Sequence, residues 1–419
     1  MEPITRKNFI GNAAAVGATL SSFSVLTSRG EASGRVFKAA LVGCGGRGNG
    51  AAKNLTAAAK QLGVSIQWVA AADWFDEKAK RCGKKFEIPE ARCYGGADGY
   101  RKVMESDAEI VVQATTPNFR PLHLEAAVAA GKHSFVEKPV AVDPPGARRI
   151  IAVGEQAKQK ALAIVAGTQR RHEARYRAAA HQIHNGAIGD ILNGQVYWLG
   201  RVPWIRPRKP GQNDPDYLIQ NWLNWSMMSG DHICEQHVHN LDVANWFIGR
   251  NPVMANGFGG RSKRTTGDQY DFFSIDFDYG EGCHVQSMCR QIAGCYSRVG
   301  EVFAGTEGTY SGKIKSGAGL DIKVPTFREG NPYVNEHYHM LESIIAEKPL
   351  NEAETVANAT MAAIMGRISA YTGQIVRWSD VMDNEKSRFY NYAVGPTAED
   401  FETGNVVAPE DDVISLPPA

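Results

Sequence analysis

A glycine pattern near the start of the chain limits the possible folds more than any other feature. The apolar run 37–42 is followed directly by the hexapeptide GCGGRG, residues 43–48, and residues 49–61 are rich in alanine and favour a helix. In this context Gly43 permits a tight turn, Gly45 lets a pyrophosphate approach the backbone, and Gly48 lets helix and strand pack closely. We therefore predict a dinucleotide-binding turn, with the phosphates at the helix N-terminus. Its residues are Gly43, Gly45, Gly46, Arg47 and Gly48.

A carboxylate ends the second apolar run. Residues 66–72 lead into Asp73, which lies 25 positions after Gly48. An acid here accepts hydrogen bonds from the adenosine ribose of NAD and repels the 2′-phosphate of NADP. No Arg or Lys is found among the next three residues, so we predict NAD in preference to NADP. Arg47 is the residue expected to weaken this preference, by turning toward a 2′-phosphate.

Strand-like and helix-like segments then alternate as far as about residue 165. This alternation predicts a Rossmann-type, doubly wound parallel sheet, in which ligands bind at the carboxyl ends of the strands. The strand-like runs are 109–114, 133–136 and 161–167, and the helical runs are 123–131 and 144–160. The residues near these ends that we expect to bind the cofactor are Thr115, Thr116, Pro117, His123, Glu137 and Lys138.

Lys138 closes the strand 133–136 within the tripeptide Glu-Lys-Pro. A lysine at the carboxyl end of a strand, close to a cofactor, can donate a hydrogen bond to an alkoxide. The alternative is a surface lysine that precedes a proline turn.

Residues 230–242, GDHICEQHVHNLD, carry the most chemistry in the second half of the chain. On one continuous helix, Glu235 and His239 would share a face, and His239 and Asp242 would be neighbours. A histidine between two carboxylates is oriented and made more basic, which proton abstraction from a hydroxyl requires. Two alternatives stay open: satisfied buried histidines, and a metal bound with His237. Residues at i and i+2 diverge on a helix, so we predict no metal site.

Two further segments are candidates for substrate contacts. Arg170 and Arg171 follow the last strand of the first domain and could bind hydroxyls or a carboxylate, or form an ion pair at a helix start. Residues 201–221 form a long, aperiodic stretch rich in Pro, Arg, Asn and aromatics, which is typical of a functional loop. The predicted substrate-binding residues are Arg170, Arg171, Trp222, His237 and Asp242.

With these motifs in place, the chain resembles the Gfo/Idh/MocA oxidoreductases from about residue 36 to residue 380. The resemblance rests on the glycine turn with Asp73, on Glu137-Lys138-Pro139 and on the motif at 230–242. It implies that Lys138 contacts both the nicotinamide and a substrate hydroxyl and that His239 is the catalytic base. Glu235 stands where the family has Asp, and His237 stands where it usually has Gly.

The resemblance also implies a function and an assembly. We expect hydride transfer between NAD and a hydroxyl carbon of a sugar, glycoside or cyclitol, with Lys138, His239 and Glu235 as the catalytic residues. The alternatives are an NAD-dependent glycosidase that oxidises, eliminates and re-reduces, and a non-catalytic sugar-binding module. Family members have an open, mainly antiparallel sheet in the second domain, often used for dimer or tetramer contacts, so we expect an α+β domain there and a homo-oligomer.

Composition and the terminal segments complete the prediction. Lys and Arg number 46 and Asp and Glu 45, with no long run of either sign, so neither nucleic acid nor an anionic membrane is an expected partner. Residues 1–34 resemble a twin-arginine export signal, except that Lys7 replaces the second arginine, and they predict a periplasmic protein, or a cytoplasmic one if the signal does not function. Export implies a tightly held NAD. The predicted domains are 35–165, 166–380 and an arm, 381–419.

Overall fold

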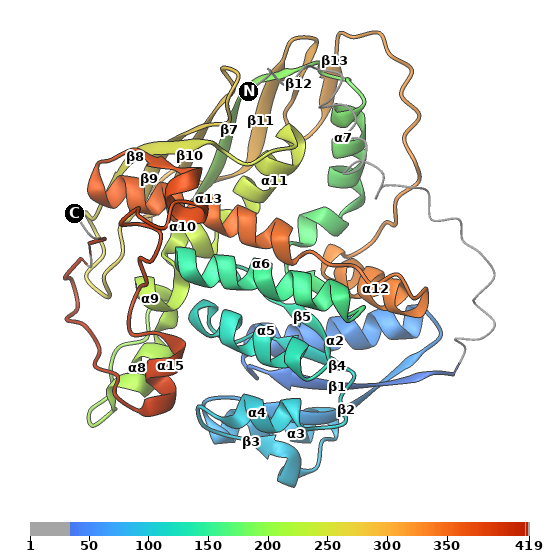
Figure 1. Cartoon of the computed structure of the whole chain (residues 1–419), viewed down its shortest axis with the longest axis vertical. Coiled ribbons are helices and arrows are strands. Elements are labelled where there is room, and N and C mark those ends of the chain that lie inside the picture. Colours follow the sequence, from blue (N-terminus) through green and yellow to red (C-terminus); the bar gives the residue numbers. More distant parts are fainter. Residues whose placement is uncertain (1–33, 415, 418–419) are drawn as a thin grey trace.

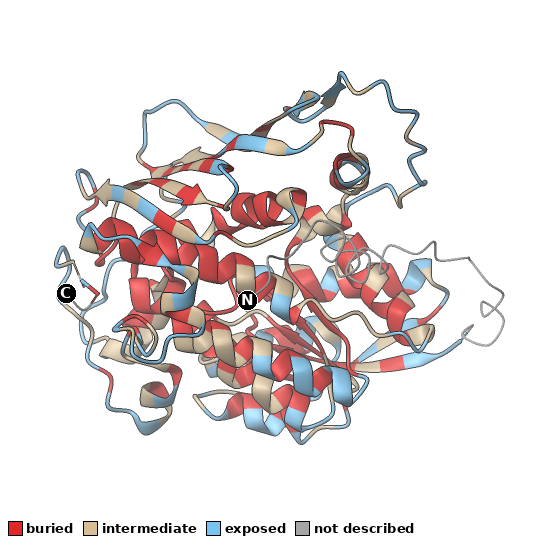
Figure 2. Ribbon diagram, turned by 45° about the horizontal axis from the view of Figure 1, so that its top comes forward, coloured by how far each residue is buried: buried red, intermediate tan, exposed pale blue. Residues whose placement is uncertain are grey.

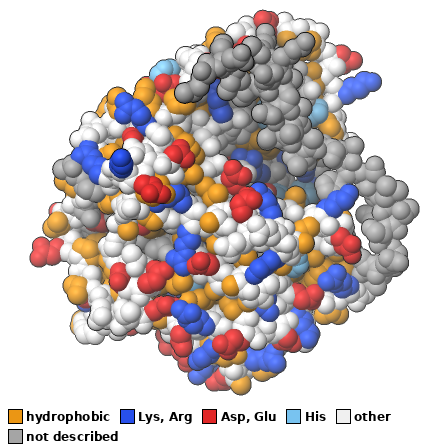
Figure 3. Space-filling view, viewed as in Figure 1, with side chains coloured by type: hydrophobic (Ala, Val, Ile, Leu, Met, Phe, Trp, Pro, Cys, Tyr) orange, Lys and Arg blue, Asp and Glu red, His pale blue; other side chains and the backbone are white. Residues whose placement is uncertain are grey.

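The computed structural model describes residues 34–414 and 416–417, which form two sheets with helices packed on and between them (Figure 1). The predicted export signal lies outside the described residues except for Gly34. Among the described helices, none is long and apolar enough to cross a membrane. Acidic and basic side chains are interspersed over the face drawn in Figure 3.

The first sheet has six parallel strands in the order β3-β2-β1-β4-β5-β6. The predicted Rossmann-type sheet is therefore confirmed, and β5 spans the residues predicted for it. The chain reverses its winding direction between β1 and β4, so a crevice forms at their carboxyl ends. The elements are β1 (Val36–Val42), α2 (Gly46–Gln61), β2 (Ser65–Ala72), α3 (Asp76–Phe86), β3 (Cys93–Tyr94), α4 (Gly99–Met104), β4 (Ile110–Gln113), α5 (Arg120–Ala129), β5 (His133–Val136), α6 (Pro144–Gln159) and β6 (Ile164–Ala166), with 3₁₀ turns at Glu90–Arg92 and Pro117–Phe119.

The second sheet has eight strands in the order β13-β12-β11-β7-β10-β9-β8-β14. All its pairs are antiparallel except β10 with β7, which confirms the mainly antiparallel sheet. Its elements are η5 (Gln169–His172), α7 (Ala174–His184), β7 (Ile191–Gly200), α8 (Asp214–Gln220), η6 (Trp222–Asn224), α9 (Ser226–Ser229), α10 (His232–Glu235), α11 (Val238–Ile248), β8 (Met254–Gly260), β9 (Phe272–Asp278), β10 (His284–Gln291), β11 (Arg298–Gly305), β12 (Gly308–Tyr310), β13 (Ile314–Ser316), α12 (Pro332–Ile345), α13 (Ala353–Thr372), β14 (Val376–Arg377), α14 (Trp378–Met382) and α15 (Ala398–Thr403).

Two late helices join the sheets. One face of α12 buries Tyr338, Met340 and Leu341 in the same apolar cluster as Phe37 and Leu41 of the first sheet. Helix α13 is buried along most of its length and lies between the two layers (Figure 2). Because these helices follow β13 in sequence, the layer of helices that covers the first sheet is completed only after most of the second sheet.

The motif at 230–242 is not the single helix that the spacing predicted. Helix α10 ends at Glu235 and α11 begins at Val238, so Glu235 and His239 do not share a helix face. Asp231 begins this segment with φ of 71° and ψ of 165°, a backbone conformation that residues other than glycine rarely adopt. Its carboxylate accepts from the backbone N–H of His232 at 2.5 Å and from the hydroxyl of Tyr371 at 2.6 Å. Burial alone would raise the pKa of Asp231, but the hydrogen bonds from His232 and Tyr371 lower it.

Replacing Tyr371 with Phe tests this anchor. The substitution keeps the ring, which stacks on Tyr270, but leaves a buried carboxylate without its hydroxyl donor. We expect a loss of about 2 kcal/mol in unfolding free energy, the usual cost of removing a hydrogen bond to a buried charge. Thermal or urea unfolding measures it. Tyr338→Phe is the matched control, because the Tyr338 hydroxyl has no hydrogen bond within the described chain; equal losses in both variants would contradict the anchor.

Candidate active site

The glycine turn has the shape that a dinucleotide pyrophosphate requires. Gly43 has φ of +94°, and a Cβ on Gly48 would lie 1.9 Å from the carbonyl oxygen of Gly43. A Cβ on Gly45 would meet no atom within 4 Å, so the turn is open on that side. The N-terminus of α2 has no side-chain cap and no acidic residue in its first turn, which leaves free N–H groups for an anion. The residues present therefore fit a nucleotide cofactor.

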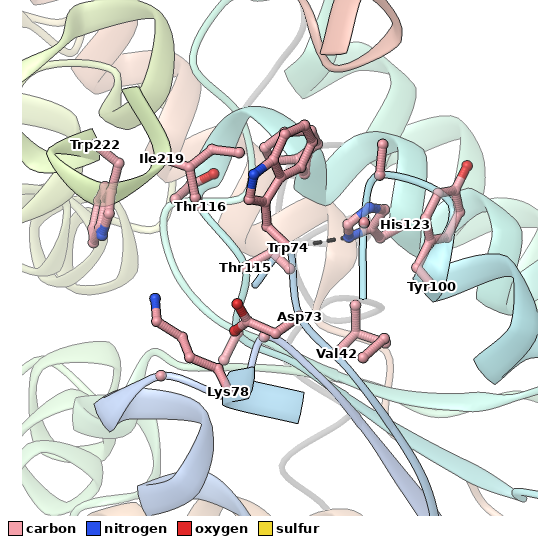
Figure 4. A pocket seen from close by; sticks show the side chains of 17 residues that line it. Val42, Asp73, Trp74, Lys78, Tyr100, Thr115, Thr116, His123, Ile219 and Trp222 are labelled. Atoms are coloured by element: carbon pink, nitrogen blue, oxygen red, sulfur yellow. Dashed lines mark hydrogen bonds between the residues drawn. The ribbon is translucent and has the colours of Figure 1, made fainter. Parts of the chain in front are cut away.

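Asp73 lies at the end of β2, on the wall of a pocket that begins at this turn (Figure 4). Its Oδ2 accepts from the backbone N–H of Cys44 at 2.8 Å, and its Oδ1 accepts from that of Phe75 at 3.0 Å. Burial raises the pKa of Asp73, and the charge of Lys78 opposes this rise. The carboxylate is thus held against the glycine turn, where a ribose hydroxyl can reach it.

The pocket brings together residues from five stretches of the chain, namely 42–45, 72–78, 96–100, 114–123 and 219–222. Thr115 Oγ1 lies 3.2 Å from Nδ1 of His123, and burial lowers the pKa of His123 to about 3, so its ring is neutral. Pro117 begins the 3₁₀ turn after Thr116 and is not itself among the lining residues. Of the residues predicted to bind the cofactor, the pocket is lined by Gly43, Gly45, Asp73, Thr115, Thr116 and His123.

Sequence reasoning missed the aromatic walls of this pocket. Trp74, Tyr100 and Phe119 line it from the first domain, and Ile219 and Trp222 line it from α8 and η6. Trp222 had been predicted to bind substrate, but the structure places it on the same pocket as Asp73. For Trp74, the only feature of the sequence that indicates a place in the pocket wall is its position directly after Asp73.

The basic residues that the structure places near Asp73 are not Arg47, the one that the sequence predicted there. Lys78 lines the Asp73 pocket, and Lys53, Lys78 and Arg81 line an adjoining groove beside Gly45 and Gly46. None of the three forms an ion pair within residues 34–414. Arg47 does not turn toward this end: its Nε lies 2.6 Å from Oε1 of Glu137. In this structure a buried carboxylate at the end of β5 therefore holds Arg47.

Lys138 joins the two domains at the end of β5. Its Nζ donates to Oε1 of Glu235 at 3.0 Å and to the backbone carbonyl of the same residue. Both side chains are only 14% exposed, so the ion pair is largely withdrawn from solvent. Glu235 thus faces Lys138 and makes no hydrogen bond to His239 in the described chain, contrary to the predicted orientation.

His239 is a buried, neutral histidine. Burial lowers its pKa well below the ordinary value, and the charges of Lys138 and Arg170 lower it further. Neither ring nitrogen has a hydrogen-bond partner within the described chain. The ring of Trp198 on β7 lies nearly parallel to it, with 5.8 Å between centroids and an interplanar angle of 23°. The prediction that flanking carboxylates make His239 more basic is therefore wrong.

The other predicted substrate residues are held by ion pairs and hydrogen bonds. Arg171 Nε donates to both carboxylate oxygens of Asp242 at 2.9 Å, so Asp242 does not contact His239. Arg170 pairs with the buried Glu301. Nε2 of His237 lies 2.7 Å from the Ser287 hydroxyl, and burial lowers the pKa of His237 to about 3. Within residues 34–414 no group of His, Cys, Asp and Glu could hold a metal ion.

Besides Glu137, a second buried acid lies near Arg47. It is Glu336 on α12, which the sequence did not indicate. Nη2 of Arg47 lies 3.8 Å from its Oε1, and neither carboxylate oxygen has a hydrogen-bond partner. Burial, followed by the nearby charge of Glu137, raises the pKa of Glu336 well above its ordinary value. Arg47 therefore lies between two carboxyl groups.

The comparisons with known proteins agree with this architecture. Residues 37–166 match the model of the GFO/IDH/MocA oxidoreductase family described as an NAD-binding Rossmann fold, and residues 176–311 match the C-terminal domain of the same family. Inositol 2-dehydrogenase of Burkholderia ambifaria is 33% identical over 216 residues, 51% of this chain and 55% of that protein. A glycosyl hydrolase family 109 protein of Streptomyces coelicolor is 27% identical over 220 residues, 47% of this chain and 45% of that protein.

The same fold is found in solved structures. Scyllo-inositol dehydrogenase from Lactobacillus casei, with bound NAD(H) and scyllo-inositol, superposes with a TM-score of 0.61 at 19% identity, over 82% of this chain and 99% of that chain. The chain spans about half the length of the curated relatives that it matches. The two family models together cover more than half of the sequence, in the order that the family requires. The chain therefore belongs to the GFO/IDH/MocA oxidoreductase family.

Proposed function

We propose that this protein transfers a hydride between NAD and a hydroxyl-bearing carbon of a neutral sugar, glycoside or cyclitol. The observation that carries the proposal is the neutral His239 in the field of Lys138, whose ammonium lies at the carboxyl end of β5. Relatives named inositol 2-dehydrogenase support this choice of substrate class.

The side chains can divide the proton chemistry between them. Bound nicotinamide supplies the site that accepts or returns the hydride. His239, neutral and without a hydrogen-bond partner, accepts the proton of the substrate hydroxyl. Lys138 donates to the oxygen on which negative charge develops. Glu235 holds Lys138 in place and balances its charge, and the Trp198 ring beside His239 offers a surface for the apolar face of a sugar.

The charge balance of the site favours a neutral substrate. Four cations near His239 in the described part of the chain already have an acidic partner, so they are not free to neutralise a carboxylate or phosphate on the substrate. The pairs are Lys138 with Glu235, Arg47 with Glu137, Arg170 with Glu301 and Arg171 with Asp242.

Replacing His239 with Asn or Lys138 with Met tests the catalytic assignment. Each change removes a group that handles the proton or the alkoxide, so we expect kcat to fall by about 10²- to 10⁴-fold, the usual contribution of acid–base catalysis. In His239→Asn the dissociation constant for NADH should stay within about threefold of the unmodified value, because His239 does not line the Asp73 pocket. Nicotinamide absorbance with inositols, aldoses and levoglucosan as substrates gives kcat, and fluorescence titration without substrate gives the dissociation constant for NADH.

His284→Asn, on the exposed part of β10, is the matched control and should leave kcat unchanged. Full activity in both catalytic-site variants would contradict the assignment. Release of an aglycone without net change in NADH would favour the redox-assisted glycosidase instead.

Replacing Asp73 with Ser tests the cofactor preference. In the unmodified protein, a 2′-phosphate would meet the Asp73 carboxylate, and we expect NAD to bind about a hundredfold more tightly than NADP. The variant should narrow this ratio by roughly tenfold, because a repulsive charge is lost while Arg81 remains beside the glycine turn. Asp76→Ser, which removes an exposed acid paired with Lys80, should leave the ratio unchanged.

A second substitution in the Asp73→Ser background identifies the cation that contacts a 2′-phosphate. Arg81→Ala should restore the NAD preference, whereas Arg47→Ala should not, because Glu137 holds Arg47. Fluorescence titration with both cofactors measures each ratio. Equal dissociation constants for NAD and NADP in the unmodified protein would refute the preference.

A further inference from the structure

The end of the chain crosses the adenosine side of the cofactor pocket. We name residues 394–411 the C-terminal clasp. It includes α15, which lies beside α8 of the second domain in Figure 1. Its apolar side chains Val394, Ala398, Phe401 and Val406 are buried in one cluster with residues of both domains, namely Phe119, Tyr217, Leu218, Trp225, Met227 and Met228. The clasp is thus a part of the folded core, although its sequence is polar and aperiodic.

Phe401 packs against two aromatic side chains that line the pocket. Its ring is 5.8 Å from Trp74 at an interplanar angle of 90°, and 5.1 Å from Phe119 at 67°. Trp74 and Phe119 both line the pocket beside Asp73, whereas Phe401 does not. Edge-to-face contacts of this kind fix the orientation of both rings. Phe401 therefore acts on the pocket through its walls.

Polar contacts fasten the clasp to the first domain. Glu402 Oε1 accepts from the hydroxyl of Tyr100 at 2.8 Å, and its Oε2 lies 2.8 Å from Nη2 of Arg101. Tyr100 is itself a lining residue of the pocket. One end of α15 is therefore tied to a third wall of the same cavity.

Other contacts fasten the clasp to the second domain. Asp411 accepts from the backbone N–H of Gly267 at 2.6 Å and from the Tyr217 hydroxyl at 3.2 Å. The backbone N–H of Ala408 donates to Asp214 Oδ2 at 2.8 Å. Asp216, on the same helix as Asp214, accepts from Nε1 of Trp74 at 2.6 Å. The pocket walls, α8 and the clasp thus form one connected set of contacts across the domain boundary.

We propose that the C-terminal clasp retains the dinucleotide by holding the aromatic walls around its adenosine half, with Phe401 as the positioning residue. This inference rests on the proposed binding of NAD. Trp74, Phe119 and α8 contribute walls of the pocket beside Asp73, and the clasp contacts all three, so it restrains the movement of these walls away from a bound adenosine. Loss of the clasp therefore speeds dissociation of the cofactor more than it slows association.

The test compares two buried phenylalanines of the same C-terminal segment. Phe401→Ala removes the ring that contacts Trp74 and Phe119. Phe389→Ala removes an equally buried ring that packs in the core under the second sheet, away from the pocket. We expect Phe401→Ala to raise the dissociation constant for NADH by roughly tenfold, mainly through a faster off-rate, while kcat at saturating NADH is unchanged. Phe389→Ala should lower the melting temperature without changing this constant by more than about twofold.

A second ligand tests whether the weakened binding concerns the adenosine half of the cofactor. ADP-ribose carries the adenosine half without nicotinamide, and Phe401→Ala should weaken it by the same factor as NADH. Phe401→Leu, which keeps most of the buried volume, covers the case in which the alanine variant does not fold, and should show a smaller loss of the same kind. An unchanged dissociation constant for NADH in the folded Phe401 variants would overturn the proposed role of the clasp. An equal weakening of NADH binding in Phe389→Ala would also overturn it. Absence of any dinucleotide binding by the unmodified protein would overturn the proposed function itself.

Discussion

The ion pair between Lys138 and Glu235 connects the two halves of the molecule at the point where the parallel strands end. Its carboxylate comes from α10 and its ammonium from the second residue after β5, and both are mostly shielded from water. A charge in such a place is stable only with a close partner, because removal of either member leaves the other buried and uncompensated. The same constraint explains the neighbouring pairs of Arg47 and Arg171. The seam between the domains is therefore polar, paired and close to neutral.

This neutrality determines the state of His239. Surrounding cations and burial both disfavour its protonated form, and Asp242, which could have supported that form, is fully engaged with Arg171. The ring can thus receive a proton but does not carry one at rest. In the proposed reaction, Lys138 provides the positive charge that stabilises the substrate oxygen while the neutral ring takes its proton. Division of the two tasks between two side chains avoids a buried imidazolium in the resting protein.

The parts of the site that could be predicted from sequence are those determined by local chemistry. The glycine turn, Asp73 after β2 and Lys138 after β5 depend on residues within one strand–turn–helix unit, and the structure places each as expected. The start of α10 could not be predicted, because Tyr371, 140 residues further on, holds Asp231. Lys78 and Arg81 were missed because only the three residues after Asp73 were considered. Both cations lie further along the chain, and helix α3 brings them to the groove.

The same distinction applies to the C-terminal segment. Residues 381–419 have no periodic pattern, so the sequence indicated a surface arm, yet Phe401 is buried against walls that lie more than 280 residues away in sequence. Contacts at that separation depend on the whole fold and leave no local signal. The aromatic rings of the Asp73 pocket belong to this group as well, since four segments contribute them.

Transfer of deuterium tests the central claim most directly. The protein, loaded with NAD, is given a neutral sugar or cyclitol that carries deuterium on its hydroxyl-bearing carbons, and the mass of the released cofactor is measured. The account predicts a reduced cofactor one mass unit heavier than the NADH formed from unlabelled substrate, and an appearance of this heavier cofactor about 10²- to 10⁴-fold slower in the His239→Asn variant. A bound cofactor that gains no deuterium from any neutral substrate, or that gains it equally without His239, would contradict hydride transfer at this site.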